Sequence, residues 1–341
     1  MSNNEQRWSP TILPRFDVQL LGRSLVEVSS AGIEVVSKRV MAPDTATIHV
    51  PWGIELSTHQ VKRGVPLTVA LGNDELGQAV VFDGQVSEIK QRNGIAIITA
   101  EDLMTCAYET SWTQTWAKGT TVDVVVNDIL AGIGLEGSVF NPEGYELAVD
   151  FVLNQQLVSE ALASLAGRFG LECWMIPGTR TVYFGPSWPY ALGLLEQDDL
   201  WEINLNSQLV KAHSLIWRDA EEFGSVKIIC VDAGFTGEDP VIGRAGEGQP
   251  EKVIRLAAKL DIDKANTRAV AELSKLRVQG YEGSLTCQLN PHIRHSQMIR
   301  LVGHDAVPES DYPVNEVVYR FNHSVGNEQV LSLAMLVEEG A

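Results

Sequence analysis

The sequence has little of what marks disulfide-rich proteins, zinc proteins or nucleic-acid binders. Its 341 residues include four cysteines, Cys106, Cys173, Cys230 and Cys287, which lie far apart and form no C-x-x-C or Cys/His motif. We therefore expect no zinc site and no disulfide framework, but reduced thiols buried in strands. Lys and Arg number 26 against 44 acidic residues, which gives a net charge of −18.

This negative charge argues against tight binding to a nucleic-acid backbone, and no basic patch or P-loop is present. It suits a surface past which a polyanion slides without adhering, and simple solubility explains it equally well. The sequence also lacks a run of about 18 apolar residues, and MSNNEQRWSPTILPR has no signal-peptide core. We expect a protein made in the cytoplasm that has no membrane span.

Residues 1–105 have the pattern of a first β-barrel domain. Short β-rich runs occur at 15–22, 45–52, 66–72, 79–89 and 94–100. Asp83-Gly84 and Asn93-Gly94 are the strongest turn signals, because both dipeptides tolerate the positive φ of tight hairpins. Many short strands at close spacing favour a barrel or a sandwich.

Residues 106–195 predict a small α/β module with two short helices and a hairpin. The first helix begins with Thr120 as N-cap and Asp123 in a capping box. Its apolar positions follow helical spacing: Val122, Val125, Val126, Ile129 and Leu130. The apolar face of a second helix consists of Val158, Ala161, Leu162, Leu165, Ala166 and Phe169, and Gly170 is the C-terminal cap of this helix. A hairpin turning at Pro177-Gly178 follows.

Residues 196–341 predict a second β-barrel domain that contains one helix, at about 264–278, with Ala269, Leu273 and Leu276 inward. The Gly-, Pro- and acid-rich segment 234–251 predicts a long exposed loop. Segments 85–100 and 316–334 share one outline: an alternating strand, a turn with Gly, and a second alternating strand. This similarity makes a doubled barrel plausible.

No catalytic or ligand-binding constellation emerges from the residue types. Gly132 to Gly137 match G-x-G-x-x-G but follow a helix, whereas a dinucleotide loop opens one, so they predict a helix stop. His292 and His295 form H-x-x-H without the glutamate and long helix of metalloproteases. His304-Asp305 lacks a serine or cysteine in an elbow context.

The remaining candidates favour ordinary roles. The acidic pairs predict solvated charge; they are Glu221-Glu222, Asp198-Asp199 and Glu338-Glu339. Trp112 and Trp116 predict aromatic packing rather than ligand stacking. We therefore expect no catalytic residue, no cofactor, no metal and no enzymatic activity.

Three stretches together resemble the hub proteins of phage tail baseplates, a group that includes late control protein D and the hub part of type VI secretion spike proteins. They are FDGQVSEIKQRNGIAIITAEDLM (82–104), WAKGTTVDVVVNDILAGIGL with 151–185, and TRAVAELSKLRVQGYEGSLTCQL through MIRLVGHD to YPVNEVVYRFN. The resemblance covers about 15–338. NPHIRHSQ departs from it, since many relatives have a compact Pro-Gly turn there.

The resemblance implies a mainly β fold, in which two tube-type antiparallel β-barrels carry inserted α/β material. It further implies a homotrimer whose ring of six barrels adapts a six-fold tail tube to a three-fold spike and leaves a channel for DNA. The implied partners are a trimeric spike, a tail tube or distal tube-ring protein, a tape measure protein and baseplate wedges, and the implied location is the virion tail. Since the last strand pattern ends close to Ala341, we expect spike and wall-degrading activities on separate chains.

Three alternatives stay open at this stage. The first is the same hub part in a phage-derived injection particle or bacteriocin, which carries no DNA. The second, of another class, is a tail-associated cell-wall hydrolase that uses His304, Asp305 or a glutamate. The third is a free β-rich binding module without a role in assembly.

Overall fold

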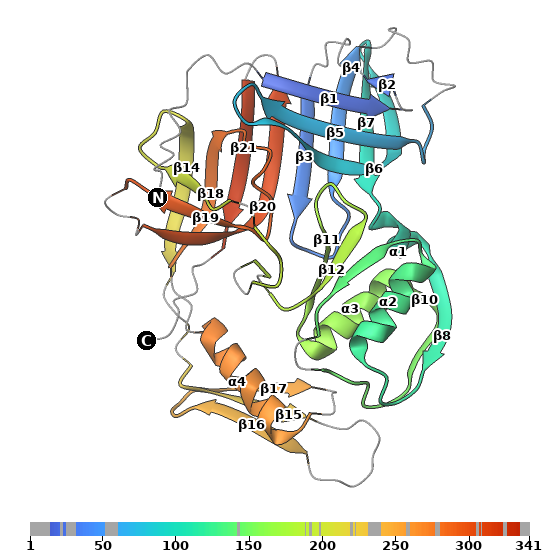
Figure 1. Ribbon diagram of the computed structural model, residues 1–341, viewed down its shortest axis with the longest axis vertical. Coiled ribbons are helices and arrows are strands. Elements are labelled where there is room, and N and C mark those ends of the chain that lie inside the picture. Colours follow the sequence, from blue (N-terminus) through green and yellow to red (C-terminus); the bar gives the residue numbers. More distant parts are fainter. Residues whose placement is uncertain are drawn as a thin grey trace.

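The computed structural model describes residues 14–20, 23–24, 32–51, 61–141, 144–187, 189–190, 193–197, 199–218, 221, 223–230, 240–256, 260–276, 280–304, 307, 309–322 and 326–334. Two groups of elements are visible in Figure 1: strands that form two barrel units, and an α/β part beneath them. The expected mainly β fold with small helical insertions is confirmed.

The first barrel unit is built around one long strand that serves two layers. Its strands are β1 (Pro14–Leu20), β2 (Arg23–Ser24), β3 (Gly32–Lys38), β4 (Thr45–Pro51), β5 (Pro66–Asn73), β6 (Gly77–Arg92) and β7 (Ile95–Asp102). The first half of β6 pairs with β5, and the second half pairs with β7, which continues to β4 and β3. Figure 1 shows β1 and β5 crossing over β3 and β4, so that the apolar faces of the two layers meet.

The second barrel unit follows the same plan. Its strands are β13 (Trp201–Asn204), β14 (Val210–Arg218), β18 (Gly280–Gln288), β19 (Met298–Val302), β20 (Ser310–Asn322) and β21 (Gly326–Leu333). The long strand is β20, whose first residues pair with β19 and whose remainder pairs with β21, followed by β18 and β14. The order β14-β18-β21-β20 therefore corresponds to β3-β4-β7-β6.

The bend of each long strand has the same backbone construction in both units. The ladder skips one residue between Val86 and Glu88 in β6, and between Val314 and Glu316 in β20, as a β-bulge does. Val86 donates its N–H to Val65 O and accepts from Gly64 N; Val314 does the same with Gln297 O and Ser296 N. Gly64 and Ser296 both have positive φ, 85° and 69°.

These matched bonds align QVSEIKQR (85–92) with PVNEVVYR (313–320).

The two units are joined edge to edge by β20 and β3. Six residue pairs connect them antiparallel, from Glu316 opposite Lys38 to Phe321 opposite Ile33. As a result, the described strands of both units form one 13-stranded sheet over a single apolar core. The sheet ends at β14 on one side and at β2 on the other, so within the described residues each unit is a rolled sheet rather than a cylinder with every edge paired.

The α/β part has a separate apolar core. Its elements are α1 (Thr105–Glu109), β8 (Ser111–Trp116), α2 (Val122–Gly132), β9 (Glu136–Val139), β10 (Phe151–Leu157), α3 (Val158–Phe169), β11 (Glu172–Met175), β12 (Thr181–Gly185), β15 (Ser225–Cys230), β16 (Val241–Gly246), β17 (Glu251–Leu256) and α4 (Ile262–Leu276). Residues of β15 to α4, from the region we assigned to the second barrel, contribute to this core. The predicted domain limits at 105 and 195 stay predictions.

Most predicted elements are confirmed. The helical faces of α2 and α3 are buried, Gly170 caps α3 in the left-handed region at φ 61°, and α4 buries Ala269, Leu273 and Leu276. The hairpin at Pro177-Gly178 forms, and Asn93-Gly94 connects β6 to β7 with positive φ at both residues. GIGLEG ends α2, as expected, with φ 75° at Gly134.

Several predictions at residue level are wrong. Asp83-Gly84 makes no turn, because β6 runs straight through it. The expected loop at 234–251 contains β16, whose Gly243 packs against the backbone of Ala265 in α4; residues 231–239 lie outside the described part. Thr121 rather than Thr120 is the N-cap of α2. Strand β3, which forms the joint, was not predicted.

We predict that Gly84→Ala destabilises the first barrel unit by about 1–3 kcal/mol, because overpacking forces backbone to move. A Cβ at Gly84 would lie 2.3 Å from Glu101 O on the neighbouring strand. Thermal unfolding measures the effect.

The matched control is Gly167→Ala on the exposed side of α3, where a Cβ meets nothing within 4 Å. This change should stabilise the protein by about 0.5–1 kcal/mol, because Gly is a poor helix residue. Equal Tm values for both variants would contradict the close approach at the bend.

Candidate functional site

The candidate functional site is the region where both barrel units contact the α/β part. The β11–β12 hairpin extends upward to this place in Figure 1. At its turn, Pro177 O accepts a hydrogen bond of 2.8 Å from Arg294 Nη1 of the second unit. A Cβ on Gly178 would lie 2.6 Å from Val80 O of the first unit, so only glycine permits this approach.

Arg39 connects all three parts of the molecule. It follows β3, and its guanidinium donates from Nη1 to both carboxylate oxygens of Glu172 on β11, at 2.9 and 2.7 Å. Its Nε donates to Asn315 Oδ1 on β20 at 3.2 Å, and its backbone N donates to Asn315 O at 3.0 Å. Burial lowers the pKa of Arg39, and the charge of Glu172 offsets part of that effect. The pair therefore fixes the module against both units.

Aromatic packing fills the interior beside this contact. Trp174 is fully buried and stacks on Tyr183, with ring centroids 4.6 Å apart and an interplanar angle of 27°. His295 meets the Trp174 ring edge-on at 4.9 Å. Burial lowers the pKa of His295 to about 3, so this imidazole is neutral at physiological pH and packs as an uncharged ring.

Two buried carboxyl groups lie at the base of the first unit. Asp44 accepts from Ser37 Oγ at 2.5 Å and from Lys38 N at 2.9 Å, while Asp102 accepts from Met104 N at 2.9 Å. Burial raises the pKa of Asp44 to about 7 and holds that of Asp102 well above its usual range, with the Asp44 charge adding to the shift. They support the turn before β4 and the start of α1.

The candidates from the sequence do not form one constellation. His292 stacks on Trp201 and has Nε2 3.0 Å from Leu76 O, so it does not share a partner with the buried His295. His304 meets His213 edge-on at 5.4 Å; Asp305 lies outside the described residues, as do Asp198, Glu222, Glu338 and Glu339. Glu221 is exposed, and Asp199 lies at the rim of a pocket.

Trp112 and Trp116 pack as predicted. Trp112 covers Gly132 at the end of α2, and buried Trp116 donates from Nε1 to Asp128 Oδ2 at 3.0 Å. The four cysteines are free thiols, of which Cys106 is half-buried and lies in α1 rather than in a strand. Within the described part of the chain, no three His, Cys, Asp or Glu side chains gather as a metal site requires. No helix described there is long and apolar enough to cross a membrane.

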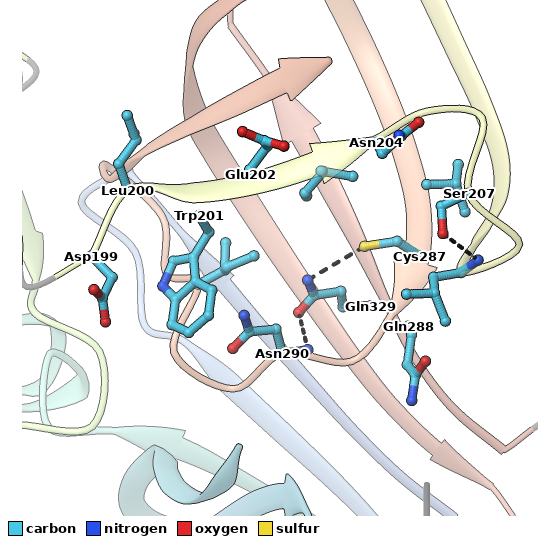
Figure 2. A pocket seen from close by; sticks show the side chains of 14 residues that line it. Asp199, Leu200, Trp201, Glu202, Asn204, Ser207, Cys287, Gln288, Asn290 and Gln329 are labelled. Atoms are coloured by element: carbon cyan, nitrogen blue, oxygen red, sulfur yellow. Dashed lines mark hydrogen bonds between the residues drawn. The ribbon is translucent and has the colours of Figure 1, made fainter. Parts of the chain in front are cut away.

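A pocket of about 570 Å³ opens in the second unit, between β13 and the end of β18 (Figure 2). In its depth, Gln329 donates to Cys287 Sγ at 3.4 Å and accepts from Asn290 N at 3.1 Å. Burial raises the pKa of the Cys287 thiol to about 11, which keeps it protonated and a poor nucleophile at neutral pH. Both ends of the Gln329 amide are therefore engaged within the protein.

Comparison with known proteins supports the fold. No family model and no curated protein matches the chain. A tail protein from Neisseria meningitidis MC58 superposes with a TM-score of 0.67 at 14% identity, over 94% of this chain and 96% of that one. The 43 kDa tail protein of prophage MuSo2 from Shewanella oneidensis gives 0.64 at 12% identity, over 95% and 100%.

A third structure is a type VI secretion component of E. coli, described as similar to the phage T4 tail proteins gp27 and gp5. It gives a TM-score of 0.56 at 13% identity, over 94% of this chain and 77% of that one. The chain has the fold of these phage tail and type VI secretion proteins. In this fold, the joint, the hairpin and Arg39 hold the two barrel units in a fixed relation.

We predict that Arg39→Gln destabilises the folded protein by about 1–3 kcal/mol, because it leaves Glu172 half-buried without its charged donor. Hydrogen exchange should rise in β11 and β12. The control is Arg15→Gln, which removes the exposed ion pair with Asp74 and should cost less than about 1 kcal/mol. Similar losses in both variants would show that Arg39 does not connect the three parts.

We also predict that the buried carboxyl pair makes stability depend on pH. The folded-state pKa of Asp44 lies near 7 against 3.8 for the ordinary group, so the folded state keeps a proton that the unfolded state loses in this range. The contribution to stability is therefore present below pH 3.8 and is lost as the pH rises to about 7. Asp44→Asn should remove on the order of 2 kcal/mol of this dependence.

Calorimetric Tm values of wild type and Asp44→Asn from pH 4.5 to 8 test this sign. The Tm difference between the two proteins reports on Asp44 alone, because His295 affects both proteins equally. The lowered pKa of His295 makes stability rise with pH below 6.5, which is opposite to the effect of Asp44. Parallel curves for the two proteins would rule the effect out.

Proposed function

We propose that this protein is a structural baseplate hub of a phage tail. Three copies form a ring of six barrel units that adapts a six-fold tail tube to a three-fold spike, and DNA passes through its centre. The observation that carries the proposal is the shared strand order of β3-β4-β7-β6 and β14-β18-β21-β20, with matched bends. Two equivalent units per chain allow a three-fold assembly to offer six similar contacts.

The face of the long sheet opposite the core supplies a suitable channel wall. Side chains alternate along the strands, and those that point away from the core form ion pairs with one another. These pairs are Lys38–Glu316, Arg320–Glu34, Arg320–Glu328, Lys211–Glu328, Arg218–Glu282 and Lys90–Glu88. We therefore propose a wall with paired charges, rather than one lined by the acidic excess of the chain, and DNA passes such a wall without strong attraction.

The role is structural and not catalytic in this proposal. The buried thiol and imidazole are held in neutral forms, and His304 packs on another histidine. The proposed partners are a trimeric spike, a tube or distal tube-ring protein, the tape measure protein and wedge proteins, within the virion tail. The same geometry serves a phage-derived injection particle or bacteriocin, which transfers no DNA.

We predict a particle with three times the 37.4 kDa mass of the chain, measured by light scattering with and without a cognate spike protein. Negative-stain averages should show six lobes around a central hole, because each copy contributes two similar units.

A stable monomer in the presence of both spike and tube proteins would overturn the hub proposal. A peptidoglycan turnover assay addresses the competing function: hydrolysis abolished by His304→Ala would establish a hydrolase instead.

A further inference from the structure

The internal joint between the barrel units is head to tail. The last strand of the second unit's order, β20, pairs with the first strand of the first unit's order, β3. The same two kinds of strand edge lie at the two ends of the order β14-β18-β21-β20-β3-β4-β7-β6. Among the described strands, β14 pairs on one edge with β18, and the half of β6 beyond Val86 pairs on one edge with β7.

The matched bends define which residues of β6 correspond to those of β20. Val86 and Val314 occupy the same place in the same hydrogen-bond pattern, so Glu88 corresponds to Glu316, Lys90 to Val318 and Arg92 to Arg320. In β20 these residues pair with β3 on the edge that the second half of β6 leaves without a described partner strand.

The ladders also relate β14 to β3. Ala46 on β4 lies opposite Ala100, and Gly283 on β18 lies opposite Leu333, the equivalent position. Val35 lies opposite Ala46 and Leu215 lies opposite Gly283, so Val35 corresponds to Leu215. By the same count, Lys38 corresponds to Arg218 and Val36 to Ile216.

From this correspondence we infer that β14 of one copy pairs antiparallel with the second half of β6 of the next copy, in the register of the internal joint. Glu88 then lies opposite Arg218, Lys90 opposite Ile216, and Arg92 opposite Ser214. This inference deepens the proposed function and rests on it, since it names the edges through which the ring closes.

Charge and exposure support this register. The internal joint has an ion pair between Lys38 and Glu316, and the transferred register again places a base, Arg218, opposite an acid, Glu88. In the single chain, Glu88 pairs with Lys90 and Arg218 pairs with Glu282, and all four side chains are partly exposed. Glu88 and Arg218 can therefore leave these partners and pair with each other.

The exposed Ile216 of β14 supports the same partner strand. Its side chain is 63% exposed, and an edge strand with an exposed apolar residue invites pairing. In the internal joint, Val36 lies opposite Val318, which is only 9% exposed. In the inferred joint, the aliphatic stem of Lys90 covers Ile216 in the same way.

Cysteine cross-linking tests the register. In a Cys106→Ser background, whose remaining cysteines are buried, the variant Lys90→Cys/Ile216→Cys should oxidise to covalent trimers on a non-reducing gel. The control Gln91→Cys/Ile216→Cys moves one cysteine to the other face of the strand and should cross-link at least about tenfold less. Both positions are exposed, and circular dichroism checks folding.

A charge exchange gives an independent readout. Glu88→Lys should weaken trimer formation in light scattering roughly tenfold by placing like charges opposite each other, and Glu88→Lys/Arg218→Glu should restore it. A wild-type trimer whose cysteine pairs do not discriminate between Lys90 and Gln91 would overturn the inferred register and leave the hub proposal intact. Monomers without cross-links under all conditions would overturn the inferred joint, and the spike and tube experiment then decides the hub separately.

Discussion

The architecture depends on the backbone pairing of β20 with β3. Strand pairing fixes both the distance and the twist between neighbouring strands, so six consecutive residue pairs leave the two barrel units little freedom to move relative to each other. The core beneath them is continuous, and Arg39 and the β11–β12 hairpin add side-chain contacts across the same junction. The α/β part, which has its own apolar core, is thereby fixed against both barrel units.

Each unit bends its long strand by the same local device. In each unit, a residue with positive φ donates its backbone N–H to the carbonyl oxygen of the valine at the bulge. That valine donates its own N–H to the carbonyl oxygen of the residue directly after the positive-φ residue. The positive-φ residue is a glycine in one unit and a serine in the other, and the hydrogen bonds use only backbone atoms. A geometry held by backbone bonds survives wide sequence change, which is consistent with similar folds at 10–14% identity.

The sequence predicted helices well and the joint poorly, for physical reasons. In α2 and α3 the apolar period is strong, and a left-handed glycine ends α3, so local information suffices. Asp83-Gly84 misled because glycine permits a close approach between strands as readily as a turn. The pairing of β3 with β20 joins residues that lie far apart in the sequence, from Lys38 with Glu316 to Ile33 with Phe321, and the Arg39–Glu172 contact depends on it; no local pattern encodes either.

Two of the ion pairs on the face opposite the core, Lys38–Glu316 and Arg320–Glu34, cross the same joint. Exposed pairs add little to stability, typically below about 1 kcal/mol each, so their value lies in register and in the field they leave. A strand that slips by one residue moves every charge to the other face and buries it, which makes the register costly to change. Close opposite charges largely cancel each other's field at a distance, and salt screens the remainder beyond a Debye length of about 8 Å. A chain with net charge −18 can therefore carry strands whose outward charges are paired, and the joint between the units aligns two of those pairs.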